Sequence, residues 1–590
     1  RNRPFCRVVP SLSAMVLVAG CGGGGGGGDV GSGGGGSGGG TPPPTQVTVT
    51  GTVTFDNPTT RPDNTLALNQ TERLPVRGAT VEILRGSDGS LLASAVTDGS
   101  GGYSASVTNT PVRIRVKAQL LKTGAGGYDL EVRDNTAGNA LYALDSAQVT
   151  PSGASLRIDL NAPTGWGGTG YTGQRAAAPF AILDMLWRAR ELLQQAEPGL
   201  VMPALDVFWA PGNNAADCEG RPNPVTGDLG TTFYVGGSGL AATGACPATP
   251  PGIYVLGDAS GDASDDADEF DPSVIAHEFA HYFQDRLGRD DSMGGPHALD
   301  SRLEPAIAFS EGWGNAFQGF VLGSPLYRDT FRTGGTSAFA FNMENDSQPF
   351  TDLLKTKTGF HSEASVQEIL WDIFDGGGEL GDAVDLGYAA IHAVMRGAVV
   401  ETPSLTSIFS FAEGLSVGYP SQATALRQRL LAEEINGTGD FAENQTLPSA
   451  PDLVPVFGTL VPGVPVTVVS TDRYSDGDAF FASYNRLGGR RYFRIDLPEG
   501  GNLNLSAQGP VGSDPDFLLY RQGIQQCANF ASACSGLDDS VVDGLEVASY
   551  TGLAPGTYLL EVAECSNLGE PCRPGPPLGD TLITVRIELP

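Results

Sequence analysis

Two kinds of sequence pattern alternate along this chain, and their order limits the folds that it can adopt. Residues 47–162 and 465–590 contain short runs of alternating apolar and polar residues separated by Gly, Asp and Asn, a pattern that predicts strands. Residues 163–448 begin with strand-like runs and continue with runs of helical spacing, which is typical of an α+β domain. We therefore expect a multidomain chain in which an α+β domain lies between an N-terminal and a C-terminal β-sandwich, with a linker at 449–464.

The N-terminal segment is typical of an exported protein. Residues 1–20 carry three arginines and then an apolar run that is too short to span a bilayer, which predicts a secretory signal. The small residues before Cys21 resemble the lipobox of bacterial lipoproteins, and this resemblance implies cleavage before Cys21 and lipid attachment to its sulfur. Residues 21–46 are glycine-rich and cannot bury a core, so they predict a flexible tether. We expect a lipid-anchored protein of the bacterial cell envelope, at the outer membrane or cell surface unless processing releases it.

The acidic composition excludes one class of partner. The formal net charge is −32, from 35 Lys+Arg against 67 Asp+Glu, and no run rich in Lys or Arg offsets it. A chain with this balance repels a phosphate backbone. We therefore expect no nucleic acid partner.

The cysteines also agree with export to an oxidising compartment. Apart from Cys6 in the signal and Cys21, they fall into local pairs without the C-x-x-C spacing of a zinc knuckle. Even numbers of cysteines in neighbouring loops of an exported protein predict disulfides. The expected pairs are Cys218 with Cys246, Cys527 with Cys534, and Cys565 with Cys572.

The stretch VIAHEFAHYFQDRL, residues 274–287, carries the strongest chemical signal in the sequence. His277 and His281 are one helical turn apart, so both imidazoles point the same way. Zinc binds imidazole nitrogen and prefers four ligands, so this pair supplies half of a coordination sphere. Glu278 lies about 100° around the helix from His277, where it can act as a base on a water molecule without ligating. We interpret the stretch as a metal site; a pair of core histidines is the alternative.

An acidic run precedes this predicted helix. Six aspartates lie between Asp258 and Asp271, and oxygen ligands of this kind suit Ca²⁺, although the EF-hand order with its Gly and closing Glu is absent. Two interpretations stay open, a solvated acidic loop and a calcium site. At its end we expect Asp271 to cap the N–H groups of the helix and Pro272 to occupy the first helical position.

A catalytic zinc needs one more protein ligand and an open position. The stretch AFSEGWGNAFQG, residues 308–319, resembles the E-G-W-[S/G]-D motif of fungalysin-type enzymes, within the gluzincin group of thermolysin-like peptidases. The matching positions are Glu311, Gly312, Trp313, Gly314 and Asn315. The resemblance implies that Glu311 is the third zinc ligand. It also implies that Asn315 holds a zinc-binding imidazole through its amide oxygen, without the charge of the Asp that the family usually has there.

Glu304 competes with Glu311 for the role of third ligand. Seven residues are nearly two helical turns, so both glutamates lie on one face of a helix. Pro305 follows Glu304 directly, however, and favours a helix that begins there. We therefore expect Glu304 to act at the helix start and Glu311 to bind the metal.

Hydrolysis of an amide also needs a group that stabilises the oxyanion. His361 precedes a predicted helix in a segment that resembles the one carrying the transition-state histidine of fungalysin and thermolysin. The segment departs from that pattern where the usual Gly and Trp are Ala364 and Gln367. We assign the role to His361 and keep His297 as the alternative donor. His392 is expected to be a core or surface residue.

Both flanking regions resemble known modules without catalytic residues. The segment 75–107 resembles the carboxypeptidase regulatory-like β-sandwich through Gly78-Ala79 and the pattern from Thr97 to Tyr103. The C-terminal region resembles the bacterial pre-peptidase C-terminal domain. The matching positions there are Tyr492, Phe493, Asp514, Asp516, Glu546 and Pro555-Gly556-Thr557-Tyr558. Both resemblances imply β-sandwich spacer or binding modules.

These features together predict an exported, lipid-anchored zinc metalloendopeptidase that acts on a protein or peptide substrate. Zn²⁺ is the expected cofactor, and the sequence leaves Ca²⁺ binding and the oligomeric state open. The alternative from another class is a surface adhesion or binding lipoprotein whose zinc domain has lost turnover. A zinc hydrolase acting on a non-peptide amide is a third interpretation.

Overall fold

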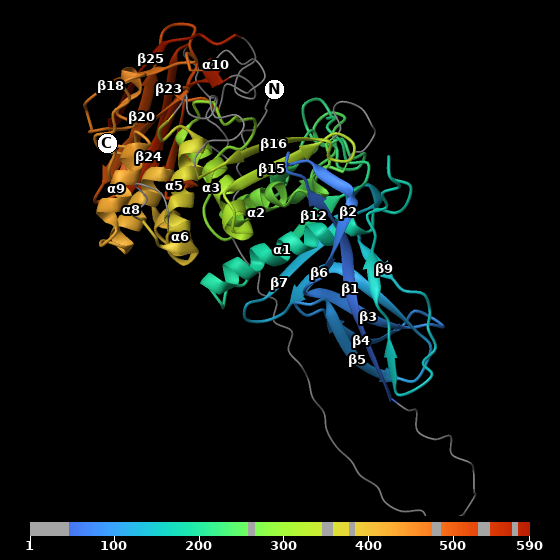
Figure 1. Cartoon of the computed structure of the whole chain (residues 1–590). Helices are drawn as coiled ribbons and strands as arrows, with labels where there is room; N and C mark the ends of the chain where they lie inside the picture. Colours follow the sequence, from blue (N-terminus) through green and yellow to red (C-terminus); the bar gives the residue numbers. More distant parts are fainter. Residues whose placement is uncertain are drawn as a thin grey trace, which may run out of the picture.

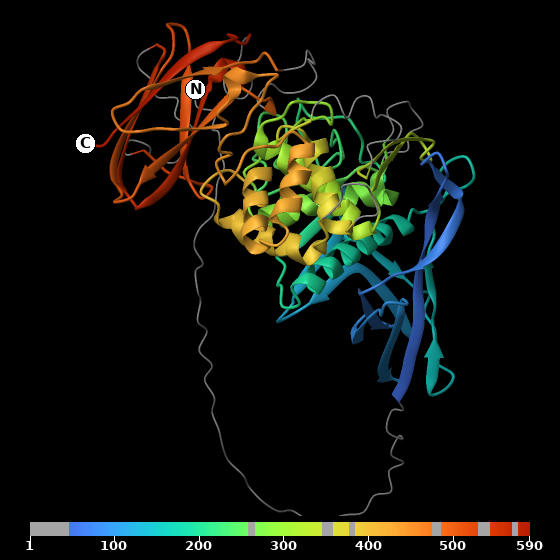
Figure 2. The same cartoon turned by 60° about the vertical axis from the view of Figure 1, so that its left-hand side comes forward.

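The computed structural model describes residues 46–257, 266–344, 358–376, 384–474, 485–528, 543–568 and 576–590. Figure 1 shows the N-terminal strands at one end of the molecule, the helices in the middle and the C-terminal strands at the other end, and Figure 2 shows the same order from a second side. The protein is therefore multidomain and β-rich, with several sheets. The expected signal, Cys21 and nearly all of the expected tether lie outside the described residues.

The first strand organises one N-terminal sheet. β1 (Gln46–Thr60) alternates buried valines, such as Val47 and Val49, with more exposed threonines, as a strand with one face on a core does. It pairs with neighbours on both sides. These are β2 (Leu66–Pro75), β5 (Gly102–Thr108), β10 (Ser155–Arg157) and β11 (Leu160–Ala162).

A second sheet crosses the boundary that the sequence predicts at residue 162. Its strand order is β13-β14-β12-β7-β6-β3-β4, with β8 beside β7 and β9 beside β6. The bounds are β3 (Ala79–Arg85), β4 (Leu91–Val96), β6 (Val112–Lys122), β7 (Tyr128–Asp134), β8 (Ala140–Leu141), β9 (Ala143–Asp145), β12 (Leu205–Trp209), β13 (Phe233–Val235) and β14 (Gly252–Val255). β7 and β12 are parallel, and such a pair requires a crossover, which α1 (Ala177–Ala196) supplies. The N-terminal region and the start of the next one therefore share a sheet.

The central region is mainly helical. Its elements are α2 (Pro272–Arg286), α3 (Pro305–Leu322), β15 (Leu326–Phe331), β16 (Ser337–Asn342), α5 (Glu363–Asp375), α6 (Gly387–Arg396), α7 (Ala398–Glu401), α8 (Ile408–Gly418) and α9 (Ala423–Ala432). α3 packs against α2 on one side and α5 on the other, and the hairpin β15–β16 lies against α2 and α3 (Figure 1). Nearly every residue of α3 is buried, so this helix is the centre of the domain. None of the helices in the described part combines the length and apolar character that a membrane span needs.

The C-terminal region has its own core between two sheets, as expected for a β-sandwich. The sheet orders are β17-β19-β24-β21-β22 and β18-β25-β20-β23. The bounds are β17 (Phe457–Thr459), β18 (Val466–Ser470), β19 (Arg490–Leu497), β20 (Gly501–Gln508), β21 (Pro515–Arg521), β22 (Ile524–Gln525), β23 (Leu545–Leu553), β24 (Gly556–Glu564) and β25 (Thr581–Glu588), with the short α10 (Cys565–Leu568) after β24. Phe493, Phe517 and Tyr558 are buried in this separate core. β17 lies within the stretch expected to be a linker, residues 449–464. It pairs with β19 and therefore belongs to this sandwich.

The sandwich is joined to the start of α3 through Glu304. The carboxylate of Glu304 accepts hydrogen bonds from the backbone N–H groups of Ala306 (3.0 Å) and Ile307 (3.3 Å), so its predicted role at the helix start is confirmed. Its other oxygen accepts a hydrogen bond from the Tyr492 hydroxyl at 2.7 Å. Its backbone N–H donates to the carbonyl of Asn485 at 2.8 Å. Hydrogen bonds therefore connect the C-terminal region directly to the start of α3.

Candidate metal centre

α2 presents the two histidines of the HEFAH stretch from one face. His277 is buried and the side chain of His281 is 15% exposed, and their rings meet edge to face with centroids 4.8 Å apart. Pro272 occupies the start of the helix as predicted, but the expected cap by Asp271 is wrong. The Asp271 carboxylate instead accepts hydrogen bonds from the backbone and hydroxyl of Thr330 in β15, at 2.8 and 2.7 Å. Those bonds and an ion pair with Arg328 hold the carboxylate on β15.

α3 brings Glu311 against the two histidines because its glycines allow a close approach. A Cβ atom on Gly314 would lie 2.6 Å from Cε1 of His277, and one on Gly312 would lie 2.5 Å from Cβ of Val366 in α5. Glycine inside a helix costs about 1 kcal/mol relative to alanine, so close packing is the gain that offsets this cost. Trp313 lies between the two glycines and donates a hydrogen bond to the carbonyl of Ala280 at 3.2 Å, which joins α3 to α2.

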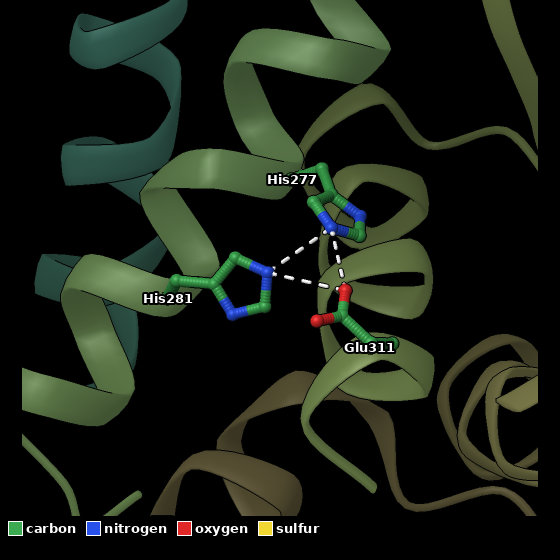
Figure 3. Close-up of side chains that lie close together, drawn as sticks. All are labelled: His277, His281 and Glu311. Atoms are coloured by element: carbon green, nitrogen blue, oxygen red, sulfur yellow. Dashed lines mark hydrogen bonds and ion pairs between the residues drawn. The ribbon is translucent and has the colours of Figure 1, made fainter. Parts of the chain in front are cut away.

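The three side chains place one atom each at the corners of a small triangle (Figure 3). The Nε2 atoms of His277 and His281 are 3.1 Å apart, and Oε2 of Glu311 is 3.2 Å from the first and 3.4 Å from the second. In a tetrahedral zinc site with bonds of about 2.0–2.1 Å, neighbouring ligand atoms are about 3.3–3.4 Å apart. The triangle therefore has the size of one face of such a tetrahedron, and these residues could hold a metal ion.

The pKa shifts of Glu311 and His281 show that the triangle and its neighbours favour a bound positive charge. Burial alone would raise the pKa of Glu311, but His297, His281 and His277 outweigh it and hold that pKa well below its ordinary value. Conversely, burial would lower the pKa of His281, but the charge and hydrogen bond of Glu311, together with the charges of Glu278 and Asp290, outweigh burial and raise this pKa to about 9. A divalent cation can take the place of those protons, because metal binding requires neutral imidazole and releases protons.

A buried amide pair orients His277. The amide nitrogen Nδ2 of Asn315 donates to Oε1 of Gln367 at 2.7 Å, which leaves Oδ1 of Asn315 to accept from Nδ1–H of His277 at 3.0 Å. With its proton on Nδ1, the ring presents the lone pair of Nε2 to the triangle. Asn315 thus lies where the sequence predicts it, whereas the contribution of Gln367 from α5 was not expected.

Ser310 orients His281 in the same manner. Its hydroxyl donates to Oε1 of Gln284 at 3.0 Å and lies 3.3 Å from Nδ1 of His281, so it can accept the proton of that nitrogen. The sequence contains no signal for this contact, because it joins two helices that are far apart along the chain. Each histidine of the triangle therefore has a partner on α3 that leaves Nε2 free to bind a metal.

We expect Asn315→Asp to retain zinc and to bind it more tightly, because a charged acceptor raises the basicity of the imidazole that it orients. Gln367 can turn its amide to donate to the new carboxylate, since Nε2 of Gln367 makes no hydrogen bond among the described residues. Asn315→Leu, which has a similar size but no acceptor, should weaken zinc binding about 10–100-fold. Competition with a chelator of known affinity measures both changes, and equal affinities for the two variants would contradict the orienting role.

Glu278 follows His277 directly on α2. It is buried, with 8% of the residue exposed. Burial raises its pKa, while the neighbouring His277 and His281 lower it. The carboxylate is not one of the three groups that form the triangle.

The structure places His297 against the triangle. Nε2 of His297 is 3.2 Å from Oε2 of Glu311, and Nδ1 lies 2.8 Å from Oε2 of Glu363 in α5. Its side chain is 31% exposed, so it is the most open member of the cluster. His361 is 2% exposed, its ring packs against Phe360, and its carbonyl accepts a hydrogen bond from Leu303. His361 is therefore part of the packing around α5.

The remaining predicted residues fall into three groups. His392 was expected in the core or at the surface; it is buried, and its Nε2 is 3.0 Å from a carboxylate oxygen of Glu197. The disulfide between Cys218 and Cys246 is confirmed. Cys527 and Cys565 are disulfide-bonded too, whereas their expected partners Cys534 and Cys572 lie outside the described residues.

Comparisons with known proteins leave the family of the chain open. No family model matches it, and no curated protein matches it. Among solved structures it is similar to the pre-peptidase C-terminal domain of a collagenase from Bacillus anthracis, with 11% identity over 22% of this chain and 94% of that chain and a TM-score of 0.15. CorA, a surface-associated copper-binding protein of Methylomicrobium album BG8, gives 11% identity over 23% of this chain and 98% of that chain, with a TM-score of 0.15.

A third solved structure is similar at the same level. It is PliG of Aeromonas hydrophila, a periplasmic inhibitor of g-type lysozyme, with 15% identity over 22% of this chain and 97% of that chain and a TM-score of 0.14. These three similarities each cover less than a quarter of this chain. The function is therefore argued from the site.

Proposed function

We propose that this chain is an exported zinc metallopeptidase of the gluzincin type, with its α+β zincin domain between the N-terminal and C-terminal β-rich regions. The observation that carries the proposal is the triangle of His277, His281 and Glu311, whose edges of 3.1–3.4 Å suit tetrahedral zinc. Two imidazole nitrogens and one carboxylate oxygen are also a typical ligand set of catalytic zinc in peptidases. Catalytic zinc held by three protein ligands would keep a fourth position for water or substrate.

A bound Zn²⁺ would act as a Lewis acid on the peptide carbonyl and on the attacking water. Glu278 takes a proton from the water and then passes it to the leaving amine. Asn315 and Ser310 hold the two imidazoles in the tautomer that keeps Nε2 unprotonated.

His297 is the residue that would stabilise the oxyanion. It shares Glu311 with the triangle and forms a second candidate group with Glu311 and Glu363. Glu363 accepts the proton on Nδ1, and both carboxylates raise the pKa of His297 to about 10 against the opposing effect of burial. A charged imidazole on the open side of the cluster is a suitable donor to a carbonyl oxygen.

We expect His297→Ala to lower kcat about 10²–10³-fold while zinc stays bound, because an oxyanion donor acts mainly in the transition state. His361→Ala is the matched control, since it removes the histidine that the sequence favoured. Activity per folded, zinc-loaded molecule should then remain close to that of the unmodified protein. Steady-state kinetics with a peptide substrate and metal analysis of both variants make the comparison. The assignment fails if His361→Ala shows the larger loss in kcat.

The proposal as a whole is tested by incubating the purified protein with unfolded casein, with and without a chelator. Cleavage that stops with chelator and returns with Zn²⁺ supports a zinc peptidase. A protein that binds zinc in stoichiometric amounts but leaves casein and unfolded control proteins intact would contradict the peptidase function.

Export and anchoring belong to the same proposal. The disulfide between Cys218 and Cys246 supports folding in an oxidising compartment. Lipid attachment would take place on Cys21, and labelling of cells with a fatty acid checks it. Cys21→Ser should remove the label from the protein, and a label that persists would refute the anchor.

A further inference from the structure

Three aspartates lie together beside the N-terminal end of α2. Asp266 and Asp268 precede the helix, and Asp329 belongs to β15. One carboxylate oxygen of each lies within 4.8 Å of those of the other two. An isolated antiparallel bridge between Asp266 and Phe331 holds the two segments side by side. We call Asp266, Asp268 and Asp329 the aspartate cluster.

One carboxylate oxygen of each aspartate in the cluster is buried without a hydrogen-bond donor among the described residues. Asp268 is only 2% exposed, and one of its oxygens, Oδ2, accepts a hydrogen bond from the hydroxyl of Thr232. The Oδ1 atom of each cluster member is buried and accepts no hydrogen bond within the described part of the chain. A buried carboxylate oxygen without a donor is unfavourable unless a cation compensates it.

Two acidic residues next to the aspartate cluster are each paired with an arginine. Glu269 forms an ion pair with Arg175, and Asp271 forms one with Arg328 at 3.2 Å. By contrast, no Lys, Arg or His of the described residues forms an ion pair with a member of the aspartate cluster. Burial also raises the pKa of all three carboxyl groups, which is the expected result of uncompensated negative charge.

We propose that the aspartate cluster binds one Ca²⁺ ion. Its ligands are all carboxylate oxygens, which hard cations prefer, and it contains none of the nitrogen or sulfur ligands that favour zinc. Oxygens bound to one Ca²⁺ at about 2.4 Å can be up to about 4.8 Å apart, whereas the shorter bonds of Mg²⁺ require a tighter octahedron. The described part of the acidic run supplies two ligands, and Asp329 supplies one that the sequence did not indicate.

The position of the site links it to the candidate metal centre. Tyr327 and Asp329 alternate with Arg328 along β15 and therefore lie on the same face of the strand. The ring of Tyr327 meets the ring of His277 edge to face, with centroids 6.2 Å apart. A bound Ca²⁺ would thus fix the strand that packs against a ligand of the triangle. Only this effect on the triangle rests on the proposed function, because Ca²⁺ binding itself does not depend on hydrolysis.

The test is calorimetric titration with Ca²⁺ of the full-length protein, after chelator treatment and reloading with Zn²⁺. We expect one Ca²⁺ per chain and a rise in Tm when Ca²⁺ is present. Asp268→Asn and Asp329→Asn should each weaken Ca²⁺ binding at least about tenfold, because the number of ligand charges sets the affinity of such sites. Asp88→Asn is the matched control, since the Asp88 side chain is 59% exposed and lies far along the chain from the cluster.

Two further measurements keep the result unambiguous. Without Ca²⁺, the Asn variants at 268 and 329 should be at least as stable as the unmodified protein, since each removes a buried repulsive charge; Asp266→Asn provides a replacement if one folds poorly. Glu311→Gln should lose zinc and keep Ca²⁺ binding, which separates this site from the peptidase proposal. The inference is overturned if the unmodified protein binds no Ca²⁺. It is also overturned if Asp329→Asn binds Ca²⁺ as tightly as the unmodified protein, or if Mg²⁺ binds as tightly as Ca²⁺.

Discussion

Glu278→Gln is expected to leave a folded, zinc-loaded protein that no longer hydrolyses casein. The triangle of ligand atoms does not include Glu278, so the substitution leaves all three ligands in place. The amide has almost the same size as the carboxylate but cannot accept a proton from water. Loss of a general base costs about 10²–10⁴-fold in rate, which would bring cleavage close to the detection limit.

Two measurements on Glu278→Gln are needed together. Metal analysis after dialysis should give one zinc per chain, and the thermal unfolding curve should match that of the unmodified protein or lie at higher temperature, since a buried charge has been removed. Substantial cleavage by a zinc-loaded variant would show that another group carries the proton. Loss of zinc would instead show that Glu278 is a ligand.

Glu311→Gln is expected to abolish zinc binding, whereas Glu304→Gln should retain it. Both substitutions neutralise a buried carboxylate, one at the N-cap of α3 and one seven residues later within α3, so they form a matched pair. Glu311 contributes an oxygen to the triangle, while Glu304 receives the first N–H groups of α3 and the Tyr492 hydroxyl. Losing an outer partner of a metal ligand costs about 10–100-fold in affinity, so losing the ligand itself should cost more.

Zinc content per chain after dialysis against a weak chelator measures this difference. Glu304→Gln should also keep its activity, because the amide oxygen can still accept hydrogen bonds from Ala306 and Ile307. If Glu304→Gln loses its zinc and Glu311→Gln keeps it, the metal site is built from other residues. Equal losses in both variants would indicate a general disturbance of α3 rather than a ligand role.

Local signals in the sequence predicted those features that depend on spacing within one helix. The one-turn separation of His277 and His281 placed both rings on one face, and Pro305 after Glu304 indicated where α3 begins. The structure then brings Glu311 from α3 to the two histidines, as the resemblance of its motif implied. The β-rich ends and the helical centre also follow from periodicity.

The sequence did not predict contacts between different helices and strands. Asp271 fits a helix cap by its position, but the donors of Thr330 in β15 take its carboxylate, and only the fold shows that β15 lies there. Gln367 and Ser310 act across helix interfaces, so nothing in their own sequence neighbourhood indicates a role. The same reason explains why the sequence favoured His361, which has a helix-start pattern, over His297, whose position depends on a loop.

Two structural links would affect proteolytic processing of the protein. They are the sheet shared by β7 and β12 and the contacts of Glu304 with the C-terminal region. A cut near residue 162 would leave β7 still hydrogen-bonded to β12, along a register that runs from Leu130 to Arg133. A cut near residue 464 would leave the Tyr492 hydroxyl on the carboxylate that begins α3. Nicked fragments should therefore copurify under native conditions and separate only in denaturant, so trimming at these boundaries would not by itself release a smaller protein.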